Sequence, residues 1–171
     1  QTLEKYNDVP FHNKMHAFGV TMGAYLLLRD YGPLLLTPVE QFGVILAALV
    51  HDIDHPGLDN AYQTNAQTEL ATKHGGGGSV LEKHHASTGL RLFRGTGIFG
   101  TFDKENKKHI CQIILTCILA TDMAGHGGMV KELENYQAGN STHEIPSEFL
   151  CALMVHAADL SGQLLPFRVA D

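Results

Sequence analysis

The sequence has no run of basic residues, no long apolar segment and few cysteines. Lys and Arg total 12 against 18 Asp and Glu, which gives a formal net charge of −6. Because a chain without a basic patch attracts phosphate backbones poorly, we expect no nucleic-acid polymer as a partner and no binding to anionic membrane surfaces. No stretch reaches the roughly 18–20 apolar residues that span a bilayer, and the first residues lack the pattern of a signal peptide. We therefore expect a cytoplasmic protein, with any membrane-anchoring region outside these residues.

The three cysteines, Cys111, Cys117 and Cys151, all lie in apolar helical patterns. An odd number of cysteines in such positions is typical of reduced, buried thiols in an intracellular protein. With 171 residues, 44% of them hydrophobic, the chain is expected to form one domain with a substantial core.

Apolar residues recur at three- and four-residue steps through nearly the whole chain, which is the period of an amphipathic helix. We find no alternating strand pattern of useful length and no internal repeat, so the predicted fold class is all-α. The helices are predicted at about residues 12–28, 37–54, 60–74, 79–93, 110–123, 126–137 and 147–159, and the segments RDYGPLLL (29–36) and RGTGIFG (94–100) are predicted loops.

Two of these helix starts carry the pattern of a capping box, Thr37 with Glu40 and Ser79 with Glu82. The glycine-rich stretch GGGGS at residues 75–79 has the composition of an engineered flexible linker and also that of a natural glycine loop. Both interpretations stay open.

The segment LVHDIDHPG (49–57) places two histidines and two aspartates directly after an apolar run. Burying an unpaired charge costs several kcal/mol, so such groups are exposed, paired with an opposite charge or bound to a metal. The chain is also rich in histidine, with 11 against 12 Lys plus Arg.

Each candidate ligand has an ordinary interpretation when it is taken alone. His12 and His16 are four residues apart and share a helical face, where a lone histidine is usually a hydrogen-bonded structural residue. His51 ends a helix, where it can answer the helix dipole. Taken together, His16, His51, Asp52 and Asp159 are four ligands on three helical segments, and two imidazoles with two carboxylates suit Zn²⁺, Mn²⁺ or Fe²⁺. A carboxylate that bridges to a second, largely water-ligated cation would favour Mg²⁺ there.

These residues and the words around them resemble the catalytic domain of class I cyclic-nucleotide phosphodiesterases, in the HD superfamily of metal-dependent phosphohydrolases. The matching words are FHNKMHAF, AALVHDIDHPG, SVLEKHH, ILATDM and ADLS, in order from about residue 11 to residue 162. An HD pair alone is weak evidence, but five ordered matches are specific. The resemblance implies a multi-helix HD-type bundle with the metal site between helices. It also implies an enzyme of signal transduction, a phosphoric diester hydrolase that converts cAMP, cGMP or both to 5′-monophosphates.

The resemblance further implies a role for each matching residue. Four residues would hold the tighter ion, expected to be Zn²⁺: His16, His51, Asp52 and Asp159. Asp52 would bridge to a second ion, Mg²⁺ or Mn²⁺, and a hydroxide between the ions would be the nucleophile. His12 would be the general acid that protonates the leaving 3′-oxygen, kept protonated in the family by a glutamate. Four further residues would lie around the second ion and order its water molecules: His55, Glu82, Thr121 and His85.

Two of these residues and the function itself have alternatives. Glu82 is also explained as a capping-box residue, and Thr121 as a helix hydroxyl that bonds back to a carbonyl. An HD phosphohydrolase of another nucleotide or phosphate ester is a second candidate, against which the five word matches speak. A non-catalytic regulatory domain that keeps the fold is a third, against which the intact His12 and ligand set speak.

The sequence departs from the family pattern at three points. Phe11 replaces a tyrosine, Met22 replaces a histidine found in many relatives, and residue 171 comes just after ADLS. We therefore expect residues 1–171 to be a partial phosphodiesterase catalytic domain, without the helices that supply the purine-binding glutamine and the hydrophobic clamp. The expected partner is a small cyclic nucleotide. Regulatory domains are expected elsewhere in the full-length chain, and a homodimer is a compatible assembly.

Overall fold

The structure, a computed structural model, describes residues 2–138 and 144–164. Its α-helices are α1 (Lys14–Leu35), α2 (Pro38–Val50), α3 (Asn60–Asn65), α4 (Glu69–Lys73), α5 (Val80–Thr96), α6 (Lys104–Leu119), α7 (His126–Gln137) and α8 (Ser147–Leu160). Three short 3-10 helices accompany them: η1 (Leu3–Lys5), η2 (Met123–Gly125) and η3 (Ser161–Leu164). The described residues contain no strand, so the predicted all-α fold is confirmed.

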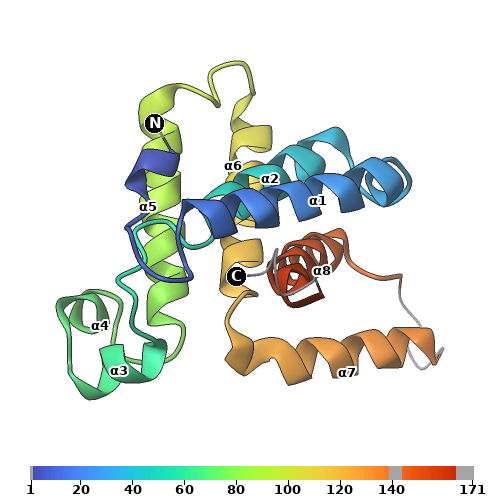
Figure 1. Cartoon of the computed structure of the whole chain (residues 1–171). Helices are drawn as coiled ribbons and strands as arrows, with labels where there is room; N and C mark the ends of the chain where they lie inside the picture. Colours follow the sequence, from blue (N-terminus) through green and yellow to red (C-terminus); the bar gives the residue numbers. More distant parts are fainter. Residues whose placement is uncertain (1, 139–143, 165–171) are drawn as a thin grey trace.

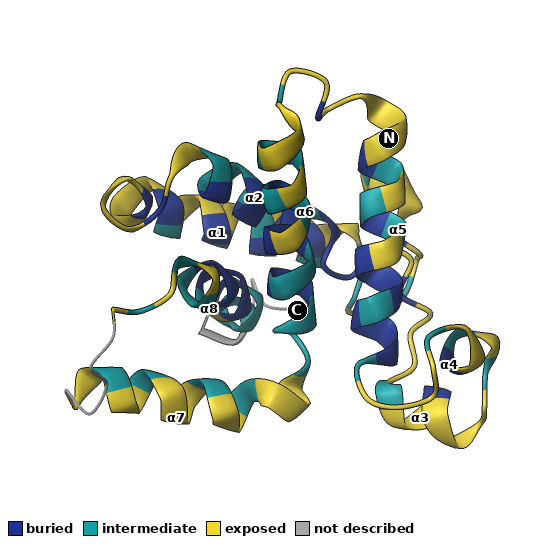
Figure 2. Ribbon diagram, turned by 180° about the vertical axis from the view of Figure 1, so that it is seen from behind, coloured by how far each residue is buried: buried dark blue, intermediate teal, exposed yellow. Residues whose placement is uncertain are grey.

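Helix α2 lies at the centre of the bundle and packs against α1, α6 and α8 (Figure 1). Its sequence explains this position, because Val44, Ala47 and Val50 are fully buried and the helix is apolar on most of its circumference. Gly43 allows α6 to approach closely, since a methyl group there would lie 2.8 Å from Cγ2 of Ile113. Buried faces of these helices meet in the middle of the molecule, whereas α3, α4 and α7 are largely exposed (Figure 2).

Helix α5 packs against α6 and reaches the C-terminal end of α2. The contact depends on Gly89, where a methyl group would lie 2.5 Å from Cγ2 of Val50. Helices α3 and α4 in turn lie against α5. The end of α2, where the HDID segment begins, is therefore enclosed by α1, α5 and α8.

Helix α1 continues through Leu35, so the predicted loop at residues 29–36 is wrong for all but its last residue. Pro33 lies inside the helix and removes one backbone hydrogen bond. It does so only in the last turn, where the amide of Leu36 still donates to the carbonyl of Gly32 at 2.9 Å. Gln41 holds the same end of the helix by donating from Nε2 to the carbonyl of Leu36 at 2.9 Å. Packing against α2 thus outweighs the loss at Pro33.

The two predicted capping boxes differ in outcome. At Thr37 both hydrogen bonds of the box are present, and Pro38 occupies the first helical position. At Ser79 the capping box is absent, because the residue has a left-handed backbone (φ 54°) and its side chain makes no capping bond. Ser79 donates instead to Oδ2 of Asp122 at 2.6 Å. Glu82 is therefore released from the capping role and is available to the cleft described below.

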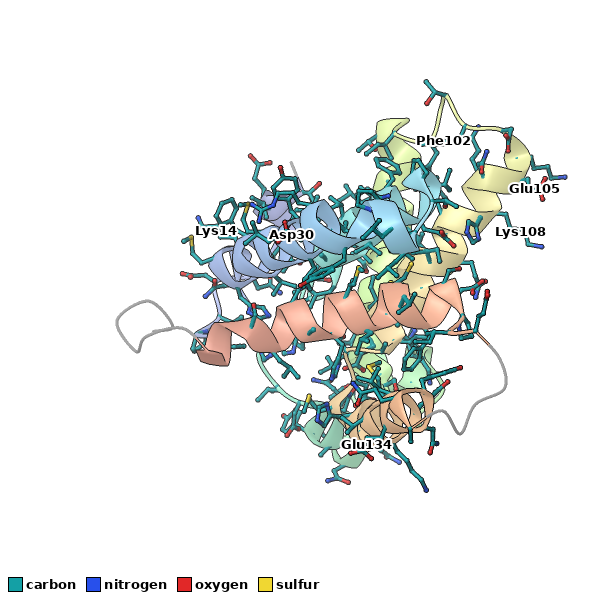
Figure 3. The ribbon with its side chains drawn as sticks, turned by 90° about the vertical axis from the view of Figure 1, so that its right-hand side faces the viewer. Lys14, Asp30, Phe102, Glu105, Lys108 and Glu134 are labelled. Carbon is teal, nitrogen blue, oxygen red and sulfur yellow. The ribbon has the colours of Figure 1, made fainter. Side chains whose placement is uncertain are left out.

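The outer surface is charged, and α7 packs loosely. Glu105 and Lys108 of α6 project away from the bundle (Figure 3). Helix α7 has no buried residue, and its Tyr136 ring lies 6.0 Å from that of Phe149 on α8.

Among the described helices none can span a membrane alone by length and apolarity, although α6 joined to η2 and α7 passes that test as a pair bent by 81°. All three cysteines are free thiols, as predicted, and Cys111 is only partly buried.

Candidate metal centre and catalytic cleft

The HDID segment follows the last turn of α2 and is held in place by the N-terminal segment. Its backbone turns tightly, and Asp54 takes a left-handed conformation with φ 60°. The hydroxyl of Tyr6 donates to the carbonyl of Leu49 at 3.0 Å, just before this turn. Asn7 donates from Nδ2 to the carbonyl of His55 at 3.0 Å and to Oδ1 of Asp54 at 3.3 Å. Tyr6 and Asn7 thus hold both ends of the segment that carries His51 and Asp52 in place by hydrogen bonds.

The four predicted ligands meet at one point between α1, α8 and the end of α2. Nε2 of His16 lies 3.1 Å from Nε2 of His51, 3.3 Å from Oδ2 of Asp52 and 3.0 Å from Oδ1 of Asp159. Nε2 of His51 lies 3.2 Å from Oδ2 of Asp52 and 3.4 Å from Oδ1 of Asp159. Ligand atoms about 2.0–2.2 Å from a tetrahedral zinc ion are roughly 3.3–3.6 Å apart, so these distances are close to those of a zinc site.

The protonation states of His51 and Asp52 also suit a bound cation. Nδ1 of His51 lies 2.9 Å from the carbonyl of Ala48, which can only accept, so the hydrogen is on Nδ1 and Nε2 presents a lone pair to the centre. Burial alone would lower the pKa of His51, but Asp52 and Asp159 raise it well above its usual value. Burial alone would raise the pKa of Asp52, but the adjacent His51 and His16 lower it. The cluster therefore favours positive charge, whether a proton or a metal ion.

Asp52 faces a second group of ligands with its other oxygen. Oδ1 of Asp52 lies 3.8 Å from Nε2 of His85, and Asp52, His55 and His85 together could hold an ion. Nδ1 of His85 lies 2.7 Å from the carbonyl of Ile53, so the bare nitrogen is Nε2, which is buried without a hydrogen-bond partner. Burial lowers the pKa of His85 to about 3, which keeps the ring neutral. This partnerless acceptor fits a water molecule or ion beside Asp52.

His55 presents a hydrogen-bond donor, where His85 presents an acceptor, to the space beside Asp52. Its Nδ1 accepts a hydrogen bond from the amide of Gly57 at 2.9 Å, so in the neutral ring the hydrogen is on Nε2. Burial and the neighbouring His12 lower the pKa of His55 to about 4. A neutral ring with hydrogen on Nε2 donates to an oxygen and does not bind a metal directly. This favours the predicted water-ordering role over direct ligation.

Glu82 and Thr121 both line the cleft next to these residues. The carboxylate of Glu82 accepts from Nδ2 of Asn60 at 3.2 Å (Oε1) and 2.9 Å (Oε2). The hydroxyl of Thr121 donates to the carbonyl of Ile118 at 2.8 Å, as in its ordinary interpretation. Its oxygen keeps lone pairs and can still accept from a water molecule.

The cleft has a volume of about 890 Å³. Its polar lining includes Asp52, His55, Glu82, His85, Asp159 and Thr121, with Asp59, Asn60 and Asp122 further along the wall, and its larger apolar and aromatic lining residues are Phe11, Leu58, Tyr62, Met123 and Leu160. His12 lies against this cleft, with its ring stacked 4.0 Å from that of His55. No described residue makes a hydrogen bond with His12, and burial lowers its pKa. The structure thus brings all nine predicted site residues together, while their individual roles stay predictions.

Comparisons with known proteins agree with this geometry. Residues 11–171 match the family described as 3′5′-cyclic nucleotide phosphodiesterase. A high affinity cGMP-specific 3′,5′-cyclic phosphodiesterase 9A of Drosophila melanogaster is 35% identical over 100% of this chain and 11% of its own length. A 3′,5′-cyclic-AMP phosphodiesterase of the same species is 33% identical over 96% of this chain and 17% of its own length. This chain belongs to the cyclic nucleotide phosphodiesterase family.

The fold is also similar to that of a solved phosphodiesterase domain. The phosphodiesterase domain of a rhodopsin–phosphodiesterase fusion protein from Salpingoeca rosetta superposes with a TM-score of 0.91 at 33% identity, over 99% of this chain and 55% of that chain. A cGMP-specific phosphodiesterase of Dictyostelium discoideum is covered over 36% of its length. This phosphodiesterase chain therefore spans about half of the solved domain and a smaller share of the curated relatives.

Sequence reasoning missed several contributors to the site, among them Asn60 and Tyr6. Asn60 is predicted as part of a helix start, but that helix is capped by Asp59, and Asn60 reaches Glu82 instead. Tyr6 is buried beside the ligands and lies outside every quoted motif. No local pattern marks either residue, because both act on partners more than 20 positions away.

Proposed function

We propose that the protein containing this chain hydrolyses 3′,5′-cyclic nucleotides to 5′-nucleoside monophosphates in the 890 Å³ cleft. The observation that carries the proposal is the convergence of His16, His51, Asp52 and Asp159, of which the two aspartates line that cleft, in a chain of this family. The cyclic nucleotide is cAMP, cGMP or both, because the similar proteins include enzymes named for each.

We assign the two ion positions by their donor sets. His16, His51, Asp52 and Asp159 supply two nitrogens and two oxygens, which suits Zn²⁺. Oδ1 of Asp52 with surrounding water suits Mg²⁺ or Mn²⁺. When bound, such ions acidify water to give a nucleophile at neutral pH and offset charge on the phosphate.

The chain's own residues orient the water molecules between these positions. Nε2–H of His55 is a donor, whereas the bare Nε2 of His85 and the carboxylate of Glu82 are acceptors. Donor and acceptors placed around one space hold a water molecule in a single orientation. The oxygen of Thr121 adds a further acceptor at the cleft wall.

His12 is the proposed general acid, placed to donate a proton to the 3′-oxygen as the ring opens. Burial lowers the pKa of His12, an effect that Asp52 and Asp159 oppose, and no described residue makes a hydrogen bond with it. An acidic partner from outside the described residues is the proposed means of keeping His12 protonated. The solved phosphodiesterase domain has further residues that could supply such a partner, since this chain covers 55% of it.

The same reasoning assigns residues 1–171 to part of a catalytic domain. Side chains such as Tyr62 and Met123 can pack against a nucleotide, but the polar lining residues Asp59, Asn60 and Asp122 use their side chains on groups of the chain itself. We propose that purine-binding helices and regulatory domains belong to the remainder of the protein.

The test is zinc content together with hydrolysis of cAMP, cGMP and p-nitrophenyl phosphate by the protein extended to the full domain. We expect bound zinc, cyclic-nucleotide turnover and little action on the monoester. Turnover of the monoester alone would favour an HD phosphohydrolase of another substrate. Bound metal with no turnover of any substrate would favour a regulatory domain.

A further inference from the structure

The start of α5 depends on a residue from another helix. Its expected cap, Ser79, has a left-handed backbone and donates its hydroxyl to Asp122. The amide of Leu81 would then lack a partner, but it donates to Oδ1 of Asn60 at 2.9 Å. Asn60 is the first residue of α3, 21 positions earlier in the chain. It therefore replaces a local cap.

The other end of the Asn60 amide is bound to Glu82. Nδ2 donates to both carboxylate oxygens, at 3.2 Å and 2.9 Å. The orientation of the amide is determined by its partners, because the backbone N–H of Leu81 can only donate and an ionised carboxylate can only accept. Asparagine meets both demands, whereas alanine meets neither.

Glu82 has few other means of staying ionised and in place. It is 9% exposed, and burial raises the pKa of its carboxyl group, an effect that the Asn60 hydrogen bonds oppose. No described lysine, arginine or histidine forms an ion pair with it. A long side chain in this position needs a fixed donor to hold one rotamer.

We propose that Asn60 is a positioning residue, which clamps the Glu82 carboxylate against the cleft wall so that it accepts hydrogen bonds from the water molecules of the second cation. The inference rests on the proposed function for that cation. Asn60 itself acts only through Glu82. Partners of this kind typically change metal affinity or activity 10–100-fold when they are lost.

The test is a double-mutant cycle with Mn²⁺ as the probe, read by electron paramagnetic resonance on the zinc-loaded chain. Asn60→Ala should weaken Mn²⁺ binding at the second position about 10-fold or more in the wild-type background. In the Glu82→Gln background the same substitution should change it less than about 2-fold, because the group through which Asn60 acts is already altered.

Asp103→Ala is the matched control for the loss of a helix cap. Asp103 accepts from the amide of Asn106 at 2.8 Å at the start of α6, away from the cleft. It should lower the thermal midpoint without changing Mn²⁺ affinity. If Asn60 only caps α5, Asn60→Ala should change Mn²⁺ affinity equally in the wild-type and Glu82→Gln backgrounds. This result would overturn the proposal. A wild-type protein that binds no Mn²⁺ would also overturn it.

Hydrolysis by the full domain separates this inference from the proposed function. If Asn60 positions Glu82 in a phosphodiesterase, Asn60→Ala should lower kcat with little change in KM. The full domain could hydrolyse no cyclic nucleotide while Asn60→Ala still weakens Mn²⁺ binding only when Glu82 is present. That result would refute the proposed function but support the positioning role of Asn60. Hydrolysis that is unaffected by Asn60→Ala would refute the clamp and retain the function.

Discussion

The Nε2 atoms of His16 and His51 lie 3.1 Å apart, although 35 positions separate the residues in the chain. Two imidazole nitrogens this close either share a proton or lie beside a metal ion, because two bare lone pairs would repel each other. Asp52 and Asp159 complete the group with carboxylate oxygens at 3.0–3.4 Å from these nitrogens. The arrangement therefore favours a positive charge, a proton or a metal ion, and each of the four residues should matter to both metal binding and stability.

Replacing Asp159 with alanine should remove zinc from the protein. The change deletes one of four donors and leaves His16 and His51 facing each other with less negative charge, so the fold should also lose thermal stability. Metal analysis and a melting curve check both effects. Asp30→Ala is the control, because Asp30 is an exposed carboxylate paired with Arg29. Equal zinc in the wild type and in Asp159→Ala would exclude Asp159 as a ligand.

His12→Ala should lower turnover by the full domain roughly 10²–10⁴-fold, as expected for a lost general acid. Zinc content should stay near that of the wild type, because His12 is stacked on His55 and is not among the four converging ligands. A p-nitrophenyl phosphodiester needs little protonation of its leaving group and should recover most of the rate. Loss of zinc from His12→Ala would instead make His12 a ligand.

Acid should destabilise the metal-free fold through His85. Burial lowers its pKa to about 3, whereas an unfolded histidine titrates near 6.5. Between these values the unfolded chain binds a proton that the folded chain does not, so stability present above pH 6.5 is lost as the pH falls toward 3. From pH 7 to pH 5 this contribution should fall by about 2 kcal/mol.

Urea unfolding at pH 7 and pH 5, with a chelator present, measures this contribution. His85→Asn retains a donor for the Ile53 carbonyl but cannot take up a proton, so it should lose about 2 kcal/mol less than the wild type over this interval. The His85 assignment fails if His85→Asn and wild type show the same difference between the two pH values.

Local patterns predict most helices, and together with the resemblance to the phosphodiesterase family they predict the four residues that converge between α1, α8 and the end of α2. The pair His51-Asp52 after an apolar helix and the four-residue step from His12 to His16 are visible without a structure. The Ser79 capping box is not correctly predicted, since the left-handed backbone after the glycine loop diverts its hydroxyl to Asp122. The role of Asn60 depends on how α3 packs against α5, and no local pattern carries that information.

Gly89→Ala should destabilise the fold by roughly 1–3 kcal/mol, because the new methyl group meets Cγ2 of Val50 at 2.5 Å. Val50 directly precedes His51, so zinc affinity should fall as well. Gly95→Ala in the same helix has no neighbour within 4 Å and should be neutral or stabilising. Val50→Ala should restore zinc affinity to Gly89→Ala if the contact is the cause. Denaturant unfolding and zinc titration of the wild type, Gly89→Ala, Gly95→Ala and the double variant Gly89→Ala/Val50→Ala test this.

The chain of 171 residues should discriminate poorly between cyclic nucleotides. Each tenfold preference for one base requires about 1.4 kcal/mol of contacts made to that base alone. The cleft offers contacts from Phe11, Tyr62 and Met123, which suit any purine. The polar residues Asp59, Asn60 and Asp122 use their side chains on other groups of the chain. We therefore expect less than about tenfold preference between cAMP and cGMP in competition assays, and a gain in both activity and preference for the full domain. Strong preference by residues 1–171 alone would place the base-reading group within this chain.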